Sequence, residues 1–539
     1  MKRLKFAKCG CLAGAQIMRR LLPMTFLGAA AALAAAEITW KGGGDTSAWS
    51  DGTNWEGGVA PSEGDTAVIP DGKIAYMSSS DITWVASQGL ALISLPGGDS
   101  TLCITNHTTV TMTVPVAGIG KFNVANNAAQ LSLGVNNSNF TGPFYFTNST
   151  VHALRDYNEC LGKYNVVTNF AKPNGVLSIF IAQRIYNTFH LFGADYYVGT
   201  AKCSLMTYSS ALNFCGPIYV HDSFCIVAQN GTTLAFSGGL HHSGADKLQL
   251  FNSTMTVSGD TPCSLVSTTA SEAGLCLRNT LQLASPIDPA TAYISFGGGT
   301  LKFLKANLLP PTTTLLNGWS NSGDCSMKID LNGFDQQCGS IWKWKDTGAT
   351  EDNTYVTSYT NATLTVYGQI QYRTGVANSE SQRFMAFSLR GAASLDFNGT
   401  NVITSSGQRV WPKMEIRSCP TKSDTTGGLF VRRGTLTLAE DTYWPNLSRL
   451  EAHGEGLLVM NTDGVNTNNF AFVASNVVAG AVTIAAGKTL HAKTAYVGRW
   501  LRAGEYGGAD AGLDALHTLP QLLAAAARCE SPNMAAQEV

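Results

Sequence analysis

The stretch NFTGPFYFTNSTVHA, residues 139–153, is partly repeated as NFCGPIYVHDSFCIVA, residues 213–228, and the two share Asn-Phe-x-Gly-Pro-x-Tyr. In both, apolar and polar residues alternate in short runs. This period of two is typical of β-strands, because successive side chains of a strand point to opposite faces. Repetition of a strand-rich unit at irregular spacing predicts a parallel β-helix, in which coils stack and only inward side chains are constrained. A β-propeller is the second choice, since its blades usually repeat with a firmer period.

The same pattern runs from about Leu90 to Leu501. Runs of alternating apolar and polar residues, such as GTLKFL from Gly299 and ATLTVYGQIQY from Ala362, end in clusters of Asn, Gly, Ser or Asp. The 55 glycines, with abundant Ser, Thr and Asn, suit short strands and tight turns. We expect Asn and Ser side chains to stack as hydrogen-bonded ladders at the coil corners. Helical periodicity is nearly absent before LDALHTLPQLLAAAARC, residues 513–529, so the predicted class is all-β.

The charge and the N-terminal residues bear on where the chain acts. Only 14% of residues are charged and the formal net charge is -1, which disfavours nucleic acid and anionic membrane surfaces as partners. Residues 1–36 combine basic residues with the apolar run LLPMTFLGAAAALAAA, which ends in a small-x-small cleavage site before Glu37. This run is shorter than the roughly 20 residues of a membrane-spanning helix. We therefore expect a signal peptide, Sec-type export and an extracellular or cell-surface location.

The cysteines argue against a disulfide framework. Removal of Cys9 and Cys11 with the leader leaves 11 of the 13 cysteines, an odd number, and no C-x-x-C motif of zinc or redox sites occurs. Cysteine also behaves as a small buried hydrophobic residue, so most of these are expected in the core. The alternative is a pair of disulfides, Cys263–Cys276 and Cys325–Cys338.

Four segments carry a resemblance to a known group of proteins. IDLNGFDQQCGSI, residues 329–341, fits D-L-N-G-x-x-Q-x-x-G-x-(I/L), and GGLFVRRGTLTL, residues 427–438, fits G-x-L-x-x-x-G-T-L-x-L. With the tryptophan-rich residues 39–69 and the closing AAGKTLHAKTAYVGRWLRAGEY, residues 485–506, they resemble bacterial exported β-helix proteins with autotransporter-type repeats. The resemblance implies a right-handed parallel β-helix, often at the cell surface, with adhesion or a structural role more common than catalysis. It also implies that Cys338, which replaces a branched apolar residue of the family segment, is a buried free thiol.

The C-terminus departs from that group. Its self-translocating members end in a membrane barrel with a terminal aromatic residue, whereas this chain ends RCESPNMAAQEV. Too few residues follow the closing coil for a barrel, since each membrane strand takes about 9–11. No L-P-x-T-G sorting signal follows either. We predict a short tail, residues 507–539, partly helical or disordered, and a protein that is freely secreted, retained non-covalently or truncated relative to its relatives.

Residues 37–95 are predicted to form an N-terminal cap, ahead of a solenoid body over residues 96–506. A solenoid exposes apolar strand edges at its first coil, and a cap prevents end-to-end association. Trp40, Trp49 and Trp55, set among glycines, suit that role. Two alternatives stay open, calcium ligation and a carbohydrate platform, since exposed tryptophan faces stack on sugars. The calcium ligands would be Asp45, Asp51, Asn54 and Asp65.

Two segments suggest carbohydrate-active chemistry. MNTDGVN, residues 460–466, resembles the N-T-D-G-(V/I) motif of polygalacturonase-type β-helix hydrolases, which hold several acids on one face. The other motifs of those enzymes are absent or out of order, so we interpret Asp463 as a turn residue. Arg432 and Arg433 would suit the base of a lyase, but no acid cluster is near in sequence. We expect them on a solvated face, unless stacking brings acids from other coils.

Two further pairs are candidate binding residues. His241 and His242 would form a metal site with Asp246 only in a loop, because neighbours on a strand point opposite ways, and a surface turn is expected. Trp342 and Trp344 lie on one face of the strand in SIWKWKDTG. They suit a sugar-stacking stripe or, preferably, an inward-facing core pair, since they follow directly on another strand.

These patterns together predict an exported, non-catalytic solenoid with a structural or adhesion-like role and no cofactor, calcium being left open. Its expected partner is an extracellular glycan or a host or matrix surface, bound by many weak contacts along a stiff body. The alternative is a polysaccharide-binding or polysaccharide-degrading β-helix protein, either a lyase or a hydrolase. A groove in which three or more carboxylates converge favours the alternative, and a face of only Asn, Ser and Thr disfavours it.

Overall fold

The computed structural model describes residues 35–500 with short gaps, and from Ala36 the chain forms one compact unit. The gaps are 45–46, 106–108, 126–129, 148–149, 154–158, 171–175, 181–183, 193–204, 209–210, 222–223, 229–232, 243–246, 252–253, 260–261, 266–273, 278–279, 292, 297–298, 318–326, 344–353, 369, 373–383, 387, 401, 404–408, 411–412, 418–424, 440–441, 476–480, 486–487 and 489. The predicted signal peptide, apart from its last two residues, and the predicted tail therefore lie outside the described residues.

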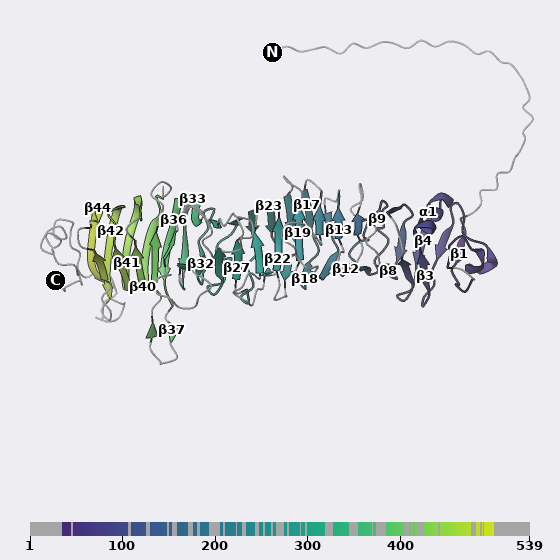
Figure 1. The fold of residues 1–539 in the computed structure, drawn as a ribbon, viewed down its shortest axis with the longest axis horizontal. Coiled ribbons are helices and arrows are strands. Elements are labelled where there is room, and N and C mark those ends of the chain that lie inside the picture. The colour runs from purple at the N-terminus through teal and green to yellow at the C-terminus, as the bar shows by residue number, and fades with distance from the viewer. Residues whose placement is uncertain are drawn as a thin grey trace, which may run out of the picture. The chain divides into compact units, whose positions relative to one another are not determined.

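The described residues form a parallel β-solenoid of about 11 turns, as the sequence predicts (Figure 1). Each strand of the main sheets pairs in parallel with the strand of a neighbouring coil. The first sheet contains β1 (Glu37–Thr39), β2 (Thr66–Val68), β4 (Leu92–Leu95) and β7 (Val116–Gly118). The second contains β3 (Ile74–Met77), β5 (Thr101–Ile104), β8 (Lys121–Ala125), β10 (Phe144–Thr147), β12 (Val166–Phe170), β15 (Thr188–Phe192), β18 (Ile218–Val220), β21 (Leu240–His242) and β24 (Ser264–Leu265).

Two longer sheets complete the coils. One contains β6 (Val110–Met112), β9 (Gln130–Leu133), β11 (Thr150–Ala153), β13 (Val176–Ile179), β16 (Leu205–Thr207), β19 (Phe224–Ala228), β22 (Lys247–Phe251), β25 (Gly274–Leu277), β27 (Tyr293–Phe296), β29 (Thr314–Asn317), β32 (Ile341–Lys343) and β34 (Ile370–Tyr372). The other, called the long sheet below, contains β14 (Arg184–Ile185), β17 (Ala211–Phe214), β20 (Thr233–Phe236), β23 (Thr254–Val257), β26 (Thr280–Leu283), β28 (Gly299–Phe303), β30 (Met327–Asp330), β31 (Gln336–Cys338), β33 (Thr354–Val366), β35 (Phe384–Ala386), β36 (Ser388–Asn398), β39 (Lys413–Arg417), β40 (Gly428–Leu438), β41 (Trp444–Met460), β42 (Val465–Ser475), β43 (Ala481–Ile484) and β44 (His491–Trp500). A separate antiparallel pair joins β37 (Val402–Ile403) to β38 (Arg409–Val410).

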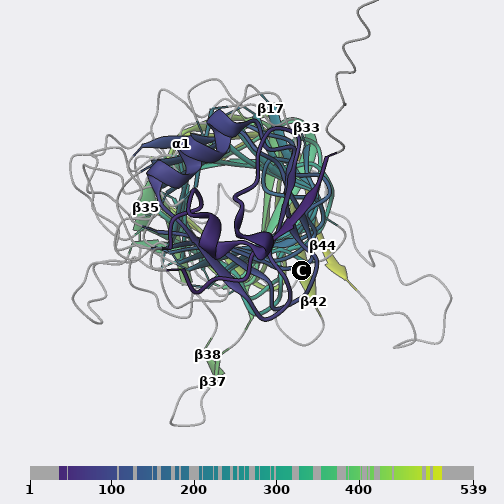
Figure 2. The same ribbon diagram turned by 90° about the vertical axis from the view of Figure 1, so that its right-hand side faces the viewer.

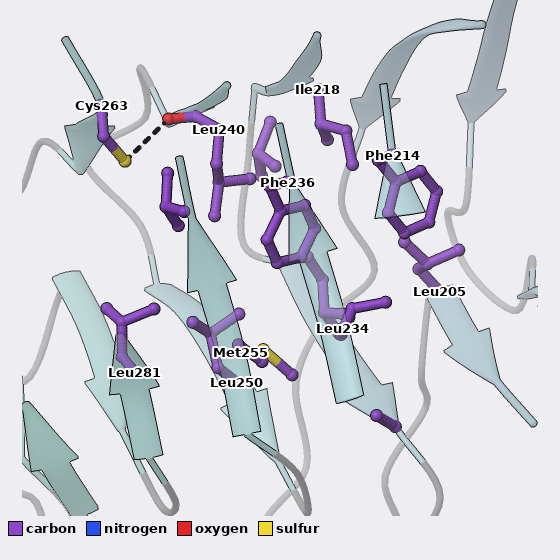
Figure 3. Packing of buried hydrophobic residues seen from close by; sticks show 14 of the residues in the cluster. Leu205, Phe214, Ile218, Leu234, Phe236, Leu240, Leu250, Met255, Cys263 and Leu281 are labelled. Carbon is purple, nitrogen blue, oxygen red and sulfur yellow. Dashed lines mark hydrogen bonds between the residues drawn. The ribbon is translucent and has the colours of Figure 1, made fainter. Parts of the chain in front are cut away.

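The core is built from columns of inward side chains, one residue from each coil. In the long sheet the column Leu212, Leu234, Met255, Leu281, Leu301, Ile329, Val356 and Leu389 is paired in register from β17 to β36. Every member is 2% exposed or less. Figure 3 shows part of this packing, including the hydrogen bond from Cys263 Sγ to the Leu240 carbonyl (3.0 Å). The alternation in the sequence thus predicts which residues face inward, because the parallel register places each inward residue next to an inward residue of the neighbouring coil.

The partial repeat occupies equivalent corners. Its two copies supply β10 and β18 of one sheet and then β11 and β19 of the next. A Cβ at Gly142 would overlap the carbonyl oxygen of Gly120, and one at Gly216 would overlap that of Asn187, so the corner requires glycine in both copies. The close approach of one coil to the previous one therefore explains the glycine that both copies share.

The predicted asparagine ladder also occurs at the corners. Asn137, Asn165 and Asn187 are at most 2% exposed. Asn137 Nδ2 donates to the Cys160 carbonyl (2.6 Å), and Asn165 Nδ2 donates to the Gly142 carbonyl (2.8 Å). Asn187 donates to Asn165 Oδ1, so the side chains of successive coils are joined directly.

The N-terminal segment contains a helix that the sequence analysis missed. After the 3-10 turns η1 (Gly52–Asn54) and η2 (Glu56–Gly58), α1 (Ser79–Gln88) lies at the end of the solenoid that Figure 2 views. Ser78 and Asp81 form a capping box, and Gly89 ends the helix in the left-handed conformation. The sequence signal that could have predicted this helix is the Ser-x-x-Asp capping pattern at its start together with the glycine at its end. The helix buries Ile82 and Val85.

The opening tryptophans form a buried cluster beside this helix. Trp40, Trp49 and Trp55 are 3%, 0% and 0% exposed, with ring centroids 4.9–5.7 Å apart. Each indole N–H donates to a backbone carbonyl, those of Ile74, Tyr76 and Trp49 respectively. The Trp49 backbone N–H donates to Asp81 Oδ1 (2.9 Å), which ties the tryptophan loop to α1. No ring face is left for a sugar, so the carbohydrate-platform alternative does not fit these three residues.

Candidate functional site

A polar cavity of about 570 Å³ lies along the long sheet. One end is lined by amide and hydroxyl groups with one carboxylate, from Asn307, Asp335, Gln336, Gln337, Thr363, Thr365 and Tyr367. The other end is charged and is lined by Asp396, Phe430, Arg432, Arg449 and Glu451. We call this feature the polar cavity and its second half the charged end.

The cavity wall is a column of residues that parallel register brings together. Gln337 pairs with Thr365, Thr365 with Asp396, Asp396 with Phe430, and Phe430 with Glu451. Five strands therefore contribute one residue each, and four strand spacings of about 4.8 Å give a wall of about 19 Å. The cavity is long enough to receive an extended chain molecule.

Two buried carboxylates hold the arginines of the charged end. Arg432 Nε lies 2.8 Å from Asp396 Oδ2, and Arg449 Nη2 donates to Glu451 Oε1. His453 Nε2 lies 2.6 Å from the other Glu451 oxygen. The side chains of Asp396 and Glu451 are 12% and 7% exposed, whereas those of Arg432 and Arg449 are 45% and 57% exposed. The buried carboxylates thus orient the arginine side chains, and the guanidinium groups stay partly exposed to solvent.

Phe430 lies beneath both guanidinium groups. The Cζ atoms of Arg432 and Arg449 are 5.7 Å and 5.8 Å from its ring centroid. The ring lies across Gly428, where a Cβ would come within 2.7 Å of Phe430 Cζ. A glycine is therefore needed at 428 to make room for the ring.

A change of register turns both neighbouring arginines outward. In the pairing of β36 with β40, Phe397 pairs with Val431 and Asn398 with Arg433, so β40 has an extra residue at Arg432, and Arg432 and Arg433 are both exposed. A β-bulge adds a residue to one strand and re-aims the side chains after it. Both arginines lie on a solvated face, as the sequence predicts, and stacking brings Asp396 from the previous coil to Arg432, the alternative that the sequence left open. Arg433 pairs instead with Glu455, at 3.6 Å.

The two buried carboxyl groups differ in pKa. Burial raises the pKa of Asp396, against the hydrogen bond and charge of Arg432. Burial acts the same way on Glu451, but the hydrogen bond from His453 and the charge of Arg449 together hold its pKa below the ordinary value. Asp396 Oδ1 is buried and has no hydrogen-bond partner among the described residues. The pKa values of Asp396 and Glu451 are therefore shifted in opposite directions from their ordinary values.

The tryptophan stripe predicted at residues 342–344 is only partly described. Ile341 is the inward residue of β32 at 0% exposure, and Trp342 lies on the outer face, half-buried against Tyr293 at 5.8 Å between centroids. The preferred inward orientation is therefore wrong for Trp342. Trp344 lies outside the described residues.

The other carbohydrate and metal candidates lie away from the polar cavity. Asp463 is on the turn after β41, with its carboxylate 3.6 Å from Lys488 Nζ. His241 and His242 are on strand β21 and not in the expected surface turn. His242 is fully buried, and His241 stacks on Tyr219 with centroids 5.0 Å apart. Asp246 lies outside the described residues.

The proposed calcium ligands that the structure describes accept hydrogen bonds from backbone N–H groups. Asp51 Oδ1 accepts from the Thr53 N–H, Asn54 Oδ1 from the Gly44 N–H, and Asp65 Oδ2 from the Ser62 N–H. Asp45 lies outside the described residues. Within the described part of the chain, no group of three or more His, Cys, Asp or Glu residues is placed to hold a metal ion.

The cysteines follow the core prediction. Cys263 and Cys338 are free and fully buried, so the disulfides Cys263–Cys276 and Cys325–Cys338 are not formed. Burial raises the pKa of both thiols well above the ordinary value. These thiols pack as small hydrophobic side chains.

The fold and this site define a class of protein, a β-solenoid with a charged polar cavity on its side. The sequence matches no family model, and comparisons with curated proteins and with solved structures find no match. In the described residues no helix is long and apolar enough to cross a membrane. Function is therefore argued from the cavity.

Proposed function

We propose that this chain is an exported, extracellular or cell-surface β-solenoid that binds a polysaccharide in the polar cavity and has an adhesion-like role. The observation that supports the proposal is one polar cavity along one sheet, lined by amides and hydroxyls and by three carboxylates, Asp335 at one end and Asp396 and Glu451 at the charged end. The leader-like residues 1–36 support export. The resemblance to autotransporter-type passengers supports a surface location.

The cavity lining suits hydroxyl-rich ligands. Amide, hydroxyl and carboxylate groups donate and accept hydrogen bonds with sugar hydroxyls, and the rings of Tyr367 and Phe430 supply the apolar part of the lining. Asp335 is held in place, because its Oδ1 accepts the Thr363 N–H at 2.7 Å. A polymer lying along successive coils gains affinity from many weak contacts.

The test is binding of the purified chain to a glycan array, followed by titration calorimetry with the glycans retained. Thr365→Trp places a large side chain in the middle of the wall and should abolish binding. Thr437→Trp adds the same side chain on β40 outside the cavity and should bind as the wild type does. Retention of no glycan, or equal loss in both variants, would contradict the proposal.

Glycoside hydrolysis is a second candidate. The backbones of Asp396 and Glu451 lie two strand spacings apart, about 9.6 Å, and inverting glycosidases place their carboxyl groups roughly 6.5–9.5 Å apart. Their opposite pKa shifts resemble an acid and a base pair. Both carboxylates, however, already bind arginines, which is why we propose binding without cleavage. Release of reducing sugars by the wild type and not by Asp396→Asn would favour hydrolysis instead.

A further inference from the structure

We infer that the sugar bound at the charged end carries an anionic group, a carboxylate or a sulfate, and that Arg432 and Arg449 bind it. The inference rests on the proposed glycan binding and adds the class of sugar and the residues that select it.

The hydrogen bonds already made by the arginines leave donors for a ligand. A guanidinium group has five N–H donors. Arg432 uses Nε for Asp396, which leaves both terminal amino groups, and Arg449 uses Nη2 for Glu451, which leaves Nε and Nη1. Both arginines line the polar cavity and their side chains are about half exposed, so a ligand in the cavity can reach the guanidinium groups.

The two groups are also close enough to act on one sugar or on two neighbouring sugars. Each Cζ lies within 5.8 Å of the Phe430 centroid, so the two guanidinium carbons are no more than about 11.6 Å apart. A planar guanidinium binds a carboxylate through two parallel hydrogen bonds. The ion pairs with Asp396 and Glu451 and the contacts with the Phe430 ring restrict both arginine side chains before the ligand binds. This restriction lowers the entropy lost on binding.

The charge balance at the charged end permits an anion there. The charges of Arg432 and Arg449 offset those of Asp396 and Glu451, Asp335 lies at the other end of the cavity, and Arg433 with Glu455 forms a further, more exposed pair. His453 adds positive charge when protonated. Asp396, whose buried Oδ1 has no hydrogen-bond partner in the described part of the chain, is itself one of the residues that line the cavity. Removing the Asp396 charge while keeping an oxygen for Arg432 should therefore strengthen anion binding.

The experiment compares matched ligands by titration calorimetry at low and moderate salt. Polygalacturonate carries a carboxylate on every sugar, and its fully methyl-esterified form has the same backbone without charge. A sulfated galactan provides the sulfate source. We expect binding to polygalacturonate or to the sulfated galactan to be at least about tenfold tighter than to the esterified polymer. The tighter of the two identifies the anion.

Variants assign the effect to residues. Arg432→Gln and Arg449→Gln should each weaken binding of the anionic polymer about tenfold and leave the esterified polymer unaffected. Arg433→Gln, on the same strand but outside the cavity, is the matched control and should change neither. Asp396→Asn should tighten anion binding several-fold.

The outcomes separate this inference from the proposed function. Equal affinity for charged and esterified polymers, with cavity-filling Thr365→Trp still abolishing both, overturns the inference and leaves glycan binding intact. Equal loss in Arg432→Gln and Arg433→Gln also overturns it, because it shows general charge attraction. Failure of all three polymers to bind, when the array retains another glycan, overturns the inference alone, and retention of no glycan at all overturns the proposed function itself.

Discussion

A single added methyl group at Gly428 tests how the charged end is built. A Cβ there would lie 2.7 Å from Cζ and 2.9 Å from Cε2 of Phe430, too close for both to stay in place. Gly428 is not among the glycines with positive φ, so alanine is allowed by the backbone. The partly exposed ring can swing outward, and we expect it to move in preference to the strand.

Two magnitudes follow for Gly428→Ala. Overpacking usually costs about 1–3 kcal/mol, and a ring that can swing toward solvent places the loss of unfolding free energy near the lower end, about 1 kcal/mol. Displacement of the ring removes its contacts with Arg432 and Arg449, each worth about 0.5–1 kcal/mol at a half-exposed site. Because these contacts also exist without ligand, their sum of about 1–2 kcal/mol sets the upper limit of the weakening of anionic-glycan binding, at about 5- to 30-fold.

The assay combines urea unfolding with calorimetric titration of polygalacturonate. Thr435→Ala, on the same strand outside the cavity, is the control and should change both quantities little. Unchanged glycan affinity in Gly428→Ala would refute the role assigned to Phe430. A loss of unfolding free energy above about 3 kcal/mol would show that the strand, and not the ring, gives way.

The remaining predictions concern stability and the core. Leu281→Ala should lower the free energy of unfolding by about 3–4 kcal/mol, because the strand hydrogen bonds of neighbouring coils keep the space left by the leucine side chain from closing. The control Thr300→Ala removes an outward side chain and should lower it by under about 0.5 kcal/mol in the same urea titration. Glu451 has a folded pKa below its ordinary value of 4.5, so its contribution to stability is present above pH 4.5 and is lost as pH falls through the folded pKa. Thermal unfolding of Glu451→Gln should accordingly depend less on pH in this acidic window than that of the wild type. The buried thiol of Cys338 should react with a thiol reagent only as fast as the chain opens, and rapid labelling of the native protein would contradict its burial.

The repeated pattern of the sequence predicts the coils because their determinants are local. Alternation identifies inward residues such as Leu281, and the shared Gly-Pro identifies a corner at Gly142 and Gly216. The helix α1 was missed because a single turn of capping signals, Ser78 to Asp81, stands among strands and its apolar face is short. Capping chemistry outweighs the surrounding pattern there.

The polar cavity could not be predicted in the same way, because its members are joined by register and not by sequence. Asp396 pairs with Phe430, 34 residues later, and Phe430 pairs with Glu451, 21 residues later. Because the coils differ so much in length, no fixed spacing in the sequence identifies this column of residues. Only the assembled register shows that the arginine pair at 432–433 has carboxylates on both sides.

The position of the cavity follows from where the strands depart from regular alternation. A strictly alternating strand would direct either Arg432 or Arg433 into the core, where an uncompensated charge is costly. Register shifts near Asn398 and Arg433 avoid this and turn both arginines outward, while Asp396 and Glu451 remain close enough to bind the arginines of the charged end. Bulges in the most regular of folds thus create a site that regular coils cannot, since regular coils repeat one kind of side chain along each face.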